Sequence, residues 1–389
     1  MNHRCTRASS RPIASLRCTG PRARSIAPAL RAIAAALLAA ALLMVAPTAA
    51  QQPPATAYHN HLVPLEQPSP LLADYPQYVE PLVETVRFEA PPLVVDKEGD
   101  LEVRAWRFSY NARGIVEVPN RIEARHTALV VVHPWGVDDG QGWRQPEPAG
   151  VALFCTPEKN AIYQRHVAEV LAPLVERLRP HVGVVAYSLP GQADPIRRRL
   201  YRSVHGRPTA DQRRSAAEEL SAVLERFEYR GGPLEAQLAL DGQPTTAAYF
   251  RAFRGLDSGD HFNGAGFWSL PIPVVASLAV DEADVVIFDA EGYEPLASLL
   301  RSEQIRHVLL AGYATDMCLC STTAGYENLS PDFNLFIVGD ATLATFPACD
   351  TPRFATQTAL AKASLSHLIT QVSWIRPVSG DAASTRSSP

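Results

Sequence analysis

Residues 307–328 read HVLLAGYATDMCLCSTTAGYEN, and this stretch decides how the rest of the chain is interpreted. It begins with an apolar run, continues through a Gly-Tyr-Ala-Thr-Asp turn and ends in residues that favour a helix. A short buried run followed by a turn and a helix is typical of a strand in a parallel sheet. Cys318 would then lie at the carboxyl end of that strand, where open α/β sheets bind their ligands.

Short apolar runs recur on both sides of this stretch, with helical stretches between most of them. This alternation predicts βαβ units and therefore a parallel sheet. We expect a Rossmann-like three-layer α/β/α fold with a six-stranded, mainly parallel sheet. The expected strands are residues 128–132, 182–187, 285–289, 308–312, 335–338 and 371–375.

The segments on either side of this sheet differ in composition. Residues 51–125 are rich in proline and predict an N-terminal extension with a small β element, a hairpin of residues 101–110 and 115–118. The α/β domain is expected at residues 126–376. A disordered tail is expected at residues 377–389.

Local signals mark two of the expected helices. Pro157 predicts the first turn of the helix that follows the first strand, and Pro173 predicts a kink in it. Residues 190–284 are far more than a βα connection needs, so we expect an insertion that covers the carboxyl edge of the sheet. Thr209 and Gln212 predict a capping box within it.

Residues 1–50 have the composition of a signal peptide. They contain seven arginines and no Asp or Glu, followed by an apolar run at residues 32–46 and small residues near Ala50. We expect a periplasmic or secreted protein with no stable membrane insertion after the signal is cleaved. The alternative is an uncleaved membrane anchor, because the apolar run approaches spanning length.

The overall composition indicates a globular protein with a small-molecule partner. Apolar residues make up 47% and charged residues 20%, so a sizeable core can form. A net charge of -4 argues against a nucleic-acid partner. Outside residues 1–50 the chain has four cysteines, whose disulfide state is left open: Cys155, Cys318, Cys320 and Cys349.

Cys318 is the strongest candidate for a chemical role. Unpaired amides and the positive end of a helix dipole stabilise a thiolate at a helix start, and the same amides could hold an oxyanion. The alternative is that Cys318 is a small buried apolar residue, as free cysteines often are.

The stretch around Cys318 resembles the isochorismatase-like cysteine hydrolase superfamily, which includes nicotinamidases and other amidases. The match rests on Gly312, Thr315, Asp316 and Cys318 and covers roughly residues 127–375 apart from the insertion. The resemblance implies a cis peptide bond before Ala314. It also implies that the amides of Ala314 and Cys318 form an oxyanion hole and that Cys318 attacks the substrate to form a covalent intermediate.

The family also uses an aspartate that ends the first strand and a lysine that ends the third. Here the first strand ends at His133, and the third ends at Phe288 and Asp289. An imidazole can take a thiol proton near neutral pH, and a carboxylate can orient it. We therefore hypothesise that His133 is the base and that Asp289 or Asp138 is its partner. Alternatively, a backbone carbonyl satisfies the His133 ring.

Four further residues are candidates for the substrate pocket: Trp135, Asp138, Glu291 and Tyr313. Turn formation is the alternative role for Asp138, and helix capping is the alternative for Glu291. Some members of the family bind metal through an Asp-x-His element after the second strand, where this chain has Ser188, Leu189, Pro190 and Gly191. We therefore expect no metal and no cofactor.

A dense basic patch follows the second strand at Arg197, Arg198, Arg199 and Arg202, and it is either solvated surface or a site for an anionic substrate group. By resemblance, the sequence predicts a hydrolase of a small amide, ester or vinyl ether. The alternative is a catalytically inactive ligand-binding or scaffold module. Relatives of this fold commonly self-associate, so a homo-oligomer is left open.

Overall fold

The computed structural model describes residues 57–109, 114–136, 157–226, 237–252, 270–345 and 352–378. The expected signal peptide lies outside these residues. So do Asp138, Cys155, Cys349 and the tail beyond residue 378. None of the described helices is long and apolar enough to span a bilayer.

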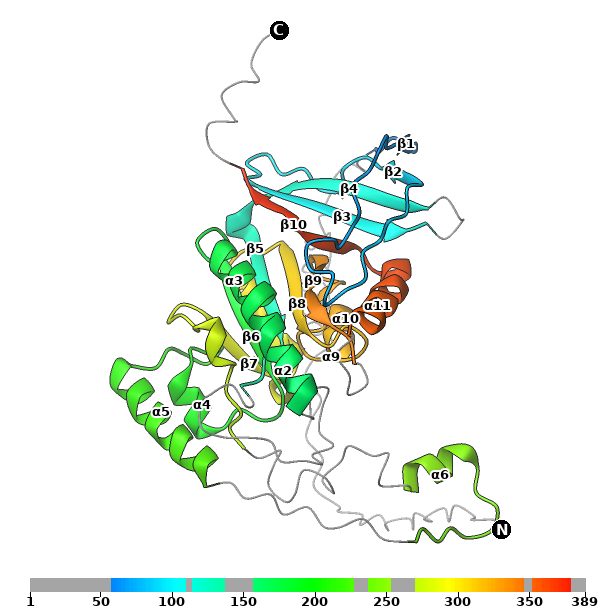
Figure 1. Ribbon diagram of the computed structural model, residues 1–389. Coiled ribbons are helices and arrows are strands. Elements are labelled where there is room, and N and C mark those ends of the chain that lie inside the picture. Colours follow the sequence, from blue (N-terminus) through cyan, green and yellow to red (C-terminus); the bar gives the residue numbers. More distant parts are fainter. Residues whose placement is uncertain are drawn as a thin grey trace, which may run out of the picture. The chain divides into compact units, whose positions relative to one another are not determined.

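Ten strands form one mixed sheet in the order β1-β2-β4-β3-β10-β9-β8-β5-β6-β7 (Figure 1). The chain is therefore of the mixed α/β class. The strands are β1 (Val63–Pro64), β2 (Arg87–Glu89), β3 (Leu101–Phe108), β4 (Ile115–Ile122), β5 (Thr127–Val132), β6 (Val184–Leu189), β7 (Val285–Phe288), β8 (His307–Tyr313), β9 (Asn334–Leu343) and β10 (Ile369–Pro377).

Within this sheet, β10, β9, β8, β5, β6 and β7 are consecutive neighbours, and each is parallel to the next. The prediction of a six-stranded sheet differs from the ten strands observed. One side of β10 pairs in parallel with β9, at Ile369 and Thr370. The other side of β10 pairs antiparallel with β3, and this pairing joins the four N-terminal strands to the expected six. Strand patterns in a sequence show which residues are extended, but they do not show which strands pair.

The N-terminal strands thus continue the main sheet. The hairpin partners β3 and β4 are antiparallel, and β2 runs parallel to β4. A buried ion pair between Arg87 and Glu117, with a hydrogen bond of 2.6 Å from the arginine Nε, joins β2 to β4. Arg104 on β3 bonds the second oxygen of Glu117 at 2.6 Å, so one carboxylate ties three strands together.

Helices cover both faces of the sheet. Leu129 and Val131 of β5 pack into one apolar cluster with α2 and α3, whereas Ala128 and Val130 pack into the other with α8, α10 and α11. The helices are α2 (Pro157–His166), α3 (Ala172–Leu178), α4 (Pro195–Leu200), α5 (Ala210–Glu225), α6 (Thr246–Ala252), α8 (Tyr293–Ser302), α9 (Cys318–Ser321), α10 (Tyr326–Leu329) and α11 (Arg353–Ser366), with 3₁₀ turns at Ala124–His126, Ala276–Leu278 and Asp289–Glu291. The predicted capping box opens α5 through Thr209 and Gln212.

A π-helical turn, Val167–Leu171, separates α2 from α3. Pro173 has no N–H to donate, and in a regular α-helix its ring would clash with the carbonyl four residues earlier. The wider turn resolves this conflict, and the Ala172 amide donates to the Val167 carbonyl five residues back. Figure 1 shows α2 and α3 running together across the strands.

Gly312 allows β8 to lie against β5 close to the carboxyl ends of both strands. Its φ is +107°, and a Cβ atom there would come within 2.2 Å of the Val132 carbonyl oxygen and 2.5 Å of its nitrogen. Any side chain at this position would therefore force the two strands apart.

We predict that Gly312→Ala lowers the free energy of unfolding by at least about 2 kcal/mol, because it combines backbone strain with a collision against rigid backbone. Urea unfolding would measure the change. Gly242→Ala is the matched control, because Gly242 also has a positive φ, +66°, but its Cβ would meet nothing within 4 Å. Equal losses in the two variants would contradict the role assigned to the β5 contact.

Candidate active site

The three candidate catalytic residues follow three strands of the parallel part of the sheet, whose order there is β8-β5-β6-β7. His133 comes directly after β5, Asp289 directly after β7, and Cys318 begins α9 shortly after β8. Because these strands are parallel, their carboxyl ends lie along one edge of the sheet. The fold therefore brings together residues that are up to about 185 positions apart in the sequence.

His133 and Asp289 are hydrogen bonded, with 2.8 Å between the imidazole Nε2 and the carboxylate Oδ2. The other carboxylate oxygen accepts a 3.1 Å hydrogen bond from the hydroxyl of Ser188, which lies on the intervening strand β6. The Ser188 carbonyl in turn accepts a 2.9 Å bond from the His133 amide. Asp289 is thus held from two sides. The partner of the His133 Nε2 atom is the Asp289 side chain, not the backbone carbonyl of the alternative interpretation.

The environment of His133 favours its charged form. Burial disfavours the charge, but hydrogen bonds and electrostatic interactions with Asp289 and Cys318 outweigh it and raise the pKa of His133 to about 9. The ring is 7% exposed. Because Nε2 is engaged by Asp289, Nδ1 is the ring nitrogen left for the Cys318 sulfur.

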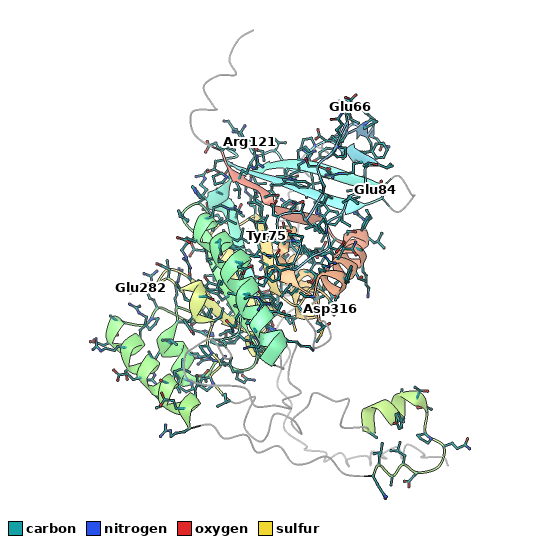
Figure 2. The ribbon with its side chains drawn as sticks, in the orientation of Figure 1. Glu66, Tyr75, Glu84, Arg121, Glu282 and Asp316 are labelled. Atoms are coloured by element: carbon teal, nitrogen blue, oxygen red, sulfur yellow. The ribbon has the colours of Figure 1, made fainter. Side chains whose placement is uncertain are left out.

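The turn that leads to Cys318 is fixed to β9. A cis peptide bond joins Tyr313 to Ala314, at the position that the resemblance implies. The Thr315 hydroxyl is 2.7 Å from that of Thr342. The carboxylate of Asp316 accepts a 2.9 Å hydrogen bond from the amide of Thr345 and another from its hydroxyl. Figure 2 shows the labelled Asp316 side chain well away from the extension strands.

The helix that begins at Cys318 is shorter than the sequence suggested. It is a single turn, Cys318–Ser321, and it ends where the Thr322 hydroxyl bonds the Cys318 carbonyl at 2.8 Å. Hydroxyl and amide side chains compete with helical hydrogen bonds, and the Asn328 amide also bonds the Thr322 carbonyl. A single turn contributes little helix dipole at the position of the sulfur.

The two cysteines of this turn differ in their surroundings. Cys318 is partly buried and free. Cys320 is also free, and its thiol donates to the Thr315 carbonyl at 3.3 Å. Burial, followed by the charges of Glu327 and Asp316, raises the pKa of the Cys320 thiol. Cys320 therefore provides an internal comparison for the reactivity of Cys318.

The candidate pocket residues are placed differently from one another. The Trp135 ring lies 6.1 Å from that of His133, and its amide bonds the His133 carbonyl. The hydroxyl of Tyr313 bonds His166 within the core. Glu291 is ion paired with His205 at 2.9 Å and with Arg198 at 3.7 Å. Asp138 lies outside the described residues.

Acidic side chains lie beside the arginines of the basic patch. Each of its four arginines lies within salt-bridge distance of a carboxylate: Arg197 of Asp194, Arg198 of Glu291, Arg199 of Glu219 and Arg202 of Glu303. The Arg197 guanidinium is also buried 4.7 Å from the centre of the Phe288 ring. Two of these contacts, Arg197 with Phe288 and Arg198 with Glu291, join the insertion to the end of β7.

Two contributors to the site were not assigned a role from the sequence. Ser188 was considered only as an argument against a metal site, and His166 had no recognisable motif. No local pattern marks either residue, because their partners are distant in the chain. Among the described residues, no group of three or more His, Cys, Asp or Glu side chains could hold a metal ion.

Comparisons with known proteins gave structural matches. The chain is similar to a cysteine hydrolase from Pseudomonas syringae pv. phaseolicola 1448A (16% identity, 65% of this chain, 91% of that chain, TM-score 0.33). It is also similar to an isochorismatase family protein from Desulfovibrio vulgaris (13%, 64%, 95%, 0.32) and to a nicotinamidase from Staphylococcus aureus (12%, 63%, 98%, 0.29). No family model and no curated protein matches the sequence.

We predict that Asp289→Asn lowers the pKa of His133 by at least about one unit, because it removes the negative charge that stabilises the imidazolium. An NMR titration of the His133 ring would measure it. Glu219→Gln, which changes a surface carboxylate bonded to Arg199, is the control and should leave this pKa unchanged. An unaltered pKa in Asp289→Asn would contradict the assigned pairing.

The same pair predicts how stability depends on pH. The pKa of His133 rises from 6.5 to about 9 on folding, so its stabilising contribution is fully present below about pH 6.5 and is lost as the pH rises through 9. The wild-type protein should therefore lose more of its unfolding free energy between pH 6.5 and 10 than Asp289→Asn does. Urea unfolding at both pH values would show the difference.

Proposed function

We propose that this chain is an exported cysteine hydrolase that cleaves a small amide, ester or vinyl-ether substrate through the thiolate of Cys318. The observation that carries the proposal is the hydrogen bond between His133 and Asp289, with Cys318 as the second group that raises the pKa of the histidine. Such a set can take a proton from a thiol and hold the resulting charge. A small-molecule substrate fits the net charge of -4, and export fits the composition of residues 1–50.

For an amide or ester, the proposed reaction has two halves. In the resting pair His133 holds the proton of Cys318, and the thiolate sulfur attacks the substrate carbonyl to form a tetrahedral oxyanion. The amides of Ala314 and Cys318 are proposed to donate to that oxygen, since the amide of the first residue of α9 has no partner within the helix. The imidazolium then protonates the leaving amine or alcohol, and a thioester to Cys318 remains.

Water completes the cycle. The neutral His133 takes a proton from water, the hydroxide attacks the thioester, and the carboxylic acid leaves as the sulfur is released. Throughout, Asp289 stabilises the imidazolium, and Ser188 holds the carboxylate in place. This arrangement assigns to histidine and aspartate the work that the family gives to an aspartate and a lysine.

We predict that iodoacetamide alkylates Cys318 at least about tenfold faster than Cys320 at pH 7, because Cys318 interacts with the buried His133 imidazole, whereas burial and the charges of Glu327 and Asp316 raise the pKa of the Cys320 thiol. Peptide mass spectrometry would follow both sites in one sample. His133→Gln should remove most of the difference, whereas Cys320→Ser should leave the Cys318 rate unchanged. Equal alkylation rates at Cys318 and Cys320 would contradict the proposal that Cys318 reacts as a thiolate.

Turnover tests the reaction itself. A panel of small amides and activated esters should include substrates that the wild-type protein hydrolyses, and Cys318→Ser should lose at least about 10³-fold in rate on those substrates. If the panel shows no Cys318-dependent hydrolysis while Cys318 is also unreactive, the chain is better described as a ligand-binding or scaffold module.

A further inference from the structure

His166 is a completely buried histidine that the proposed reaction does not use. Its Nε2 lies 2.9 Å from the backbone carbonyl oxygen of Asp340, and its Nδ1 lies 2.7 Å from the hydroxyl of Tyr313. A carbonyl oxygen can only accept, so Nε2 carries the hydrogen. In the neutral ring Nδ1 is then an acceptor, and the Tyr313 hydroxyl donates to it.

The surroundings keep this ring neutral and oriented. Burial outweighs the carbonyl of Asp340 and the charge of Glu169 and lowers the pKa of His166 to about 4, so the donor and acceptor assignments hold at neutral pH. The rings of Tyr78 and Tyr313 pack edge-on against it at 4.8 Å and 5.6 Å. Tyr78 is itself fixed by a 2.7 Å hydrogen bond to Glu169.

The position of His166 connects three distant parts of the chain. It is the last residue of α2, directly before the π-helical turn, and its two hydrogen bonds reach the end of β8 and the middle of β9. Tyr78 brings the N-terminal extension to the same ring. Buried hydrogen bonds of this kind fix one arrangement of the elements that they join.

Tyr313 is the residue directly before Ala314, whose amide is the proposed oxyanion donor. The next two residues of the turn are also anchored: Thr315 to Thr342 of β9, and Asp316 to Thr345 just after β9. The side chain of Tyr313 has its anchor on His166. The turn is therefore anchored on both sides of Ala314, and His166 supplies one side.

We propose that His166 is a positioning residue that sets the Ala314 amide for the oxyanion by fixing the Tyr313 side chain. This inference rests on the proposed function, because it assigns a task within that reaction. The hydrogen bonds of His166 go to Tyr313 and Asp340, whereas His133 is hydrogen bonded to Asp289, so the two histidines govern separate properties of the site. In this proposal, the nucleophilicity of Cys318 depends on His133. Hydrogen bonding of the oxyanion to the Ala314 amide depends on His166.

Two reagents report these properties separately. Iodoacetamide alkylates a thiolate by displacement at a CH₂ group, in which the sulfur–carbon bond forms, iodide leaves and no oxyanion develops. p-Nitrophenyl acetate acylates the same sulfur through a tetrahedral oxyanion and releases p-nitrophenolate. A defect confined to the oxyanion side slows the second reaction and spares the first.

The experiment compares Tyr313→Phe, His166→Phe and His166→Asn with the wild-type protein. Tyr313→Phe and His166→Phe should slow single-turnover acylation at least about tenfold, while alkylation of Cys318 stays within about twofold. His166→Asn keeps an acceptor near the Nδ1 position and should recover part of the lost acylation rate. Tyr187→Phe is the matched control, because it removes a buried hydroxyl that bonds Asp284 before β7 begins, and both rates should be unchanged.

The outcomes separate the two proposals. Acylation at the wild-type rate in Tyr313→Phe and His166→Phe would overturn the positioning role and leave the hydrolase proposal standing. A parallel loss of acylation and alkylation would show general damage to the site and would also overturn the positioning role. A wild-type protein that is inert to both reagents would overturn the proposed function, and the role of His166 would fall with it.

Discussion

The close contact between Gly312 and Val132 is the constraint on which the candidate site depends. The two backbones approach so closely that only a hydrogen fits on the α-carbon of residue 312. From this point His133 follows one strand, and the turn to Cys318 follows the other. Histidine and cysteine are therefore brought together by backbone packing, and their meeting does not rely on the flexible reach of long side chains.

The chemistry of the site depends on how the charge of His133 is stabilised at the carboxyl edge of the sheet. A buried imidazolium is costly unless opposite charges stand beside it. Asp289 supplies one such charge, and the hydroxyl of Ser188 fixes the orientation of the carboxylate. An imidazole base is larger than a carboxylate base, and its ring must be oriented by a hydrogen bond. His133 is oriented by Asp289, and Asp289 by Ser188, so residues of β5, β6 and β7 or directly after them contribute to one proton acceptor.

Much of the architecture could be predicted from the sequence, because apolar runs report burial directly. All six runs became strands, and the stretch at residues 307–328 placed Cys318 at the end of β8. The juxtaposition of His133 and Asp289 could also be predicted, since parallel strands end along the same edge. The pairing of β3 with β10 could not, because register between distant segments depends on tertiary packing.

The candidate site shows the same division. For the arginine patch, the sequence left solvated surface and an anion site open. It could not show that each arginine has an acidic partner, because partners such as Glu291 and Glu303 come from distant segments. The short α9 reflects hydroxyl side chains whose hydrogen bonds appear only in three dimensions. No sequence pattern marks His166, because the role proposed for it depends on a hydrogen bond to Tyr313, almost 150 positions away.

The joining of β3 to β10 has a further consequence for the N-terminal extension. A protein cut at residue 125 would keep every residue of the candidate site, but it would leave the outer side of β10 with unpaired amides and carbonyls. Such an open edge recruits extended chains from other molecules. The extension thus covers a strand edge that would otherwise be open. The change of composition near residue 125 marks a boundary in the sequence that the folded sheet does not share.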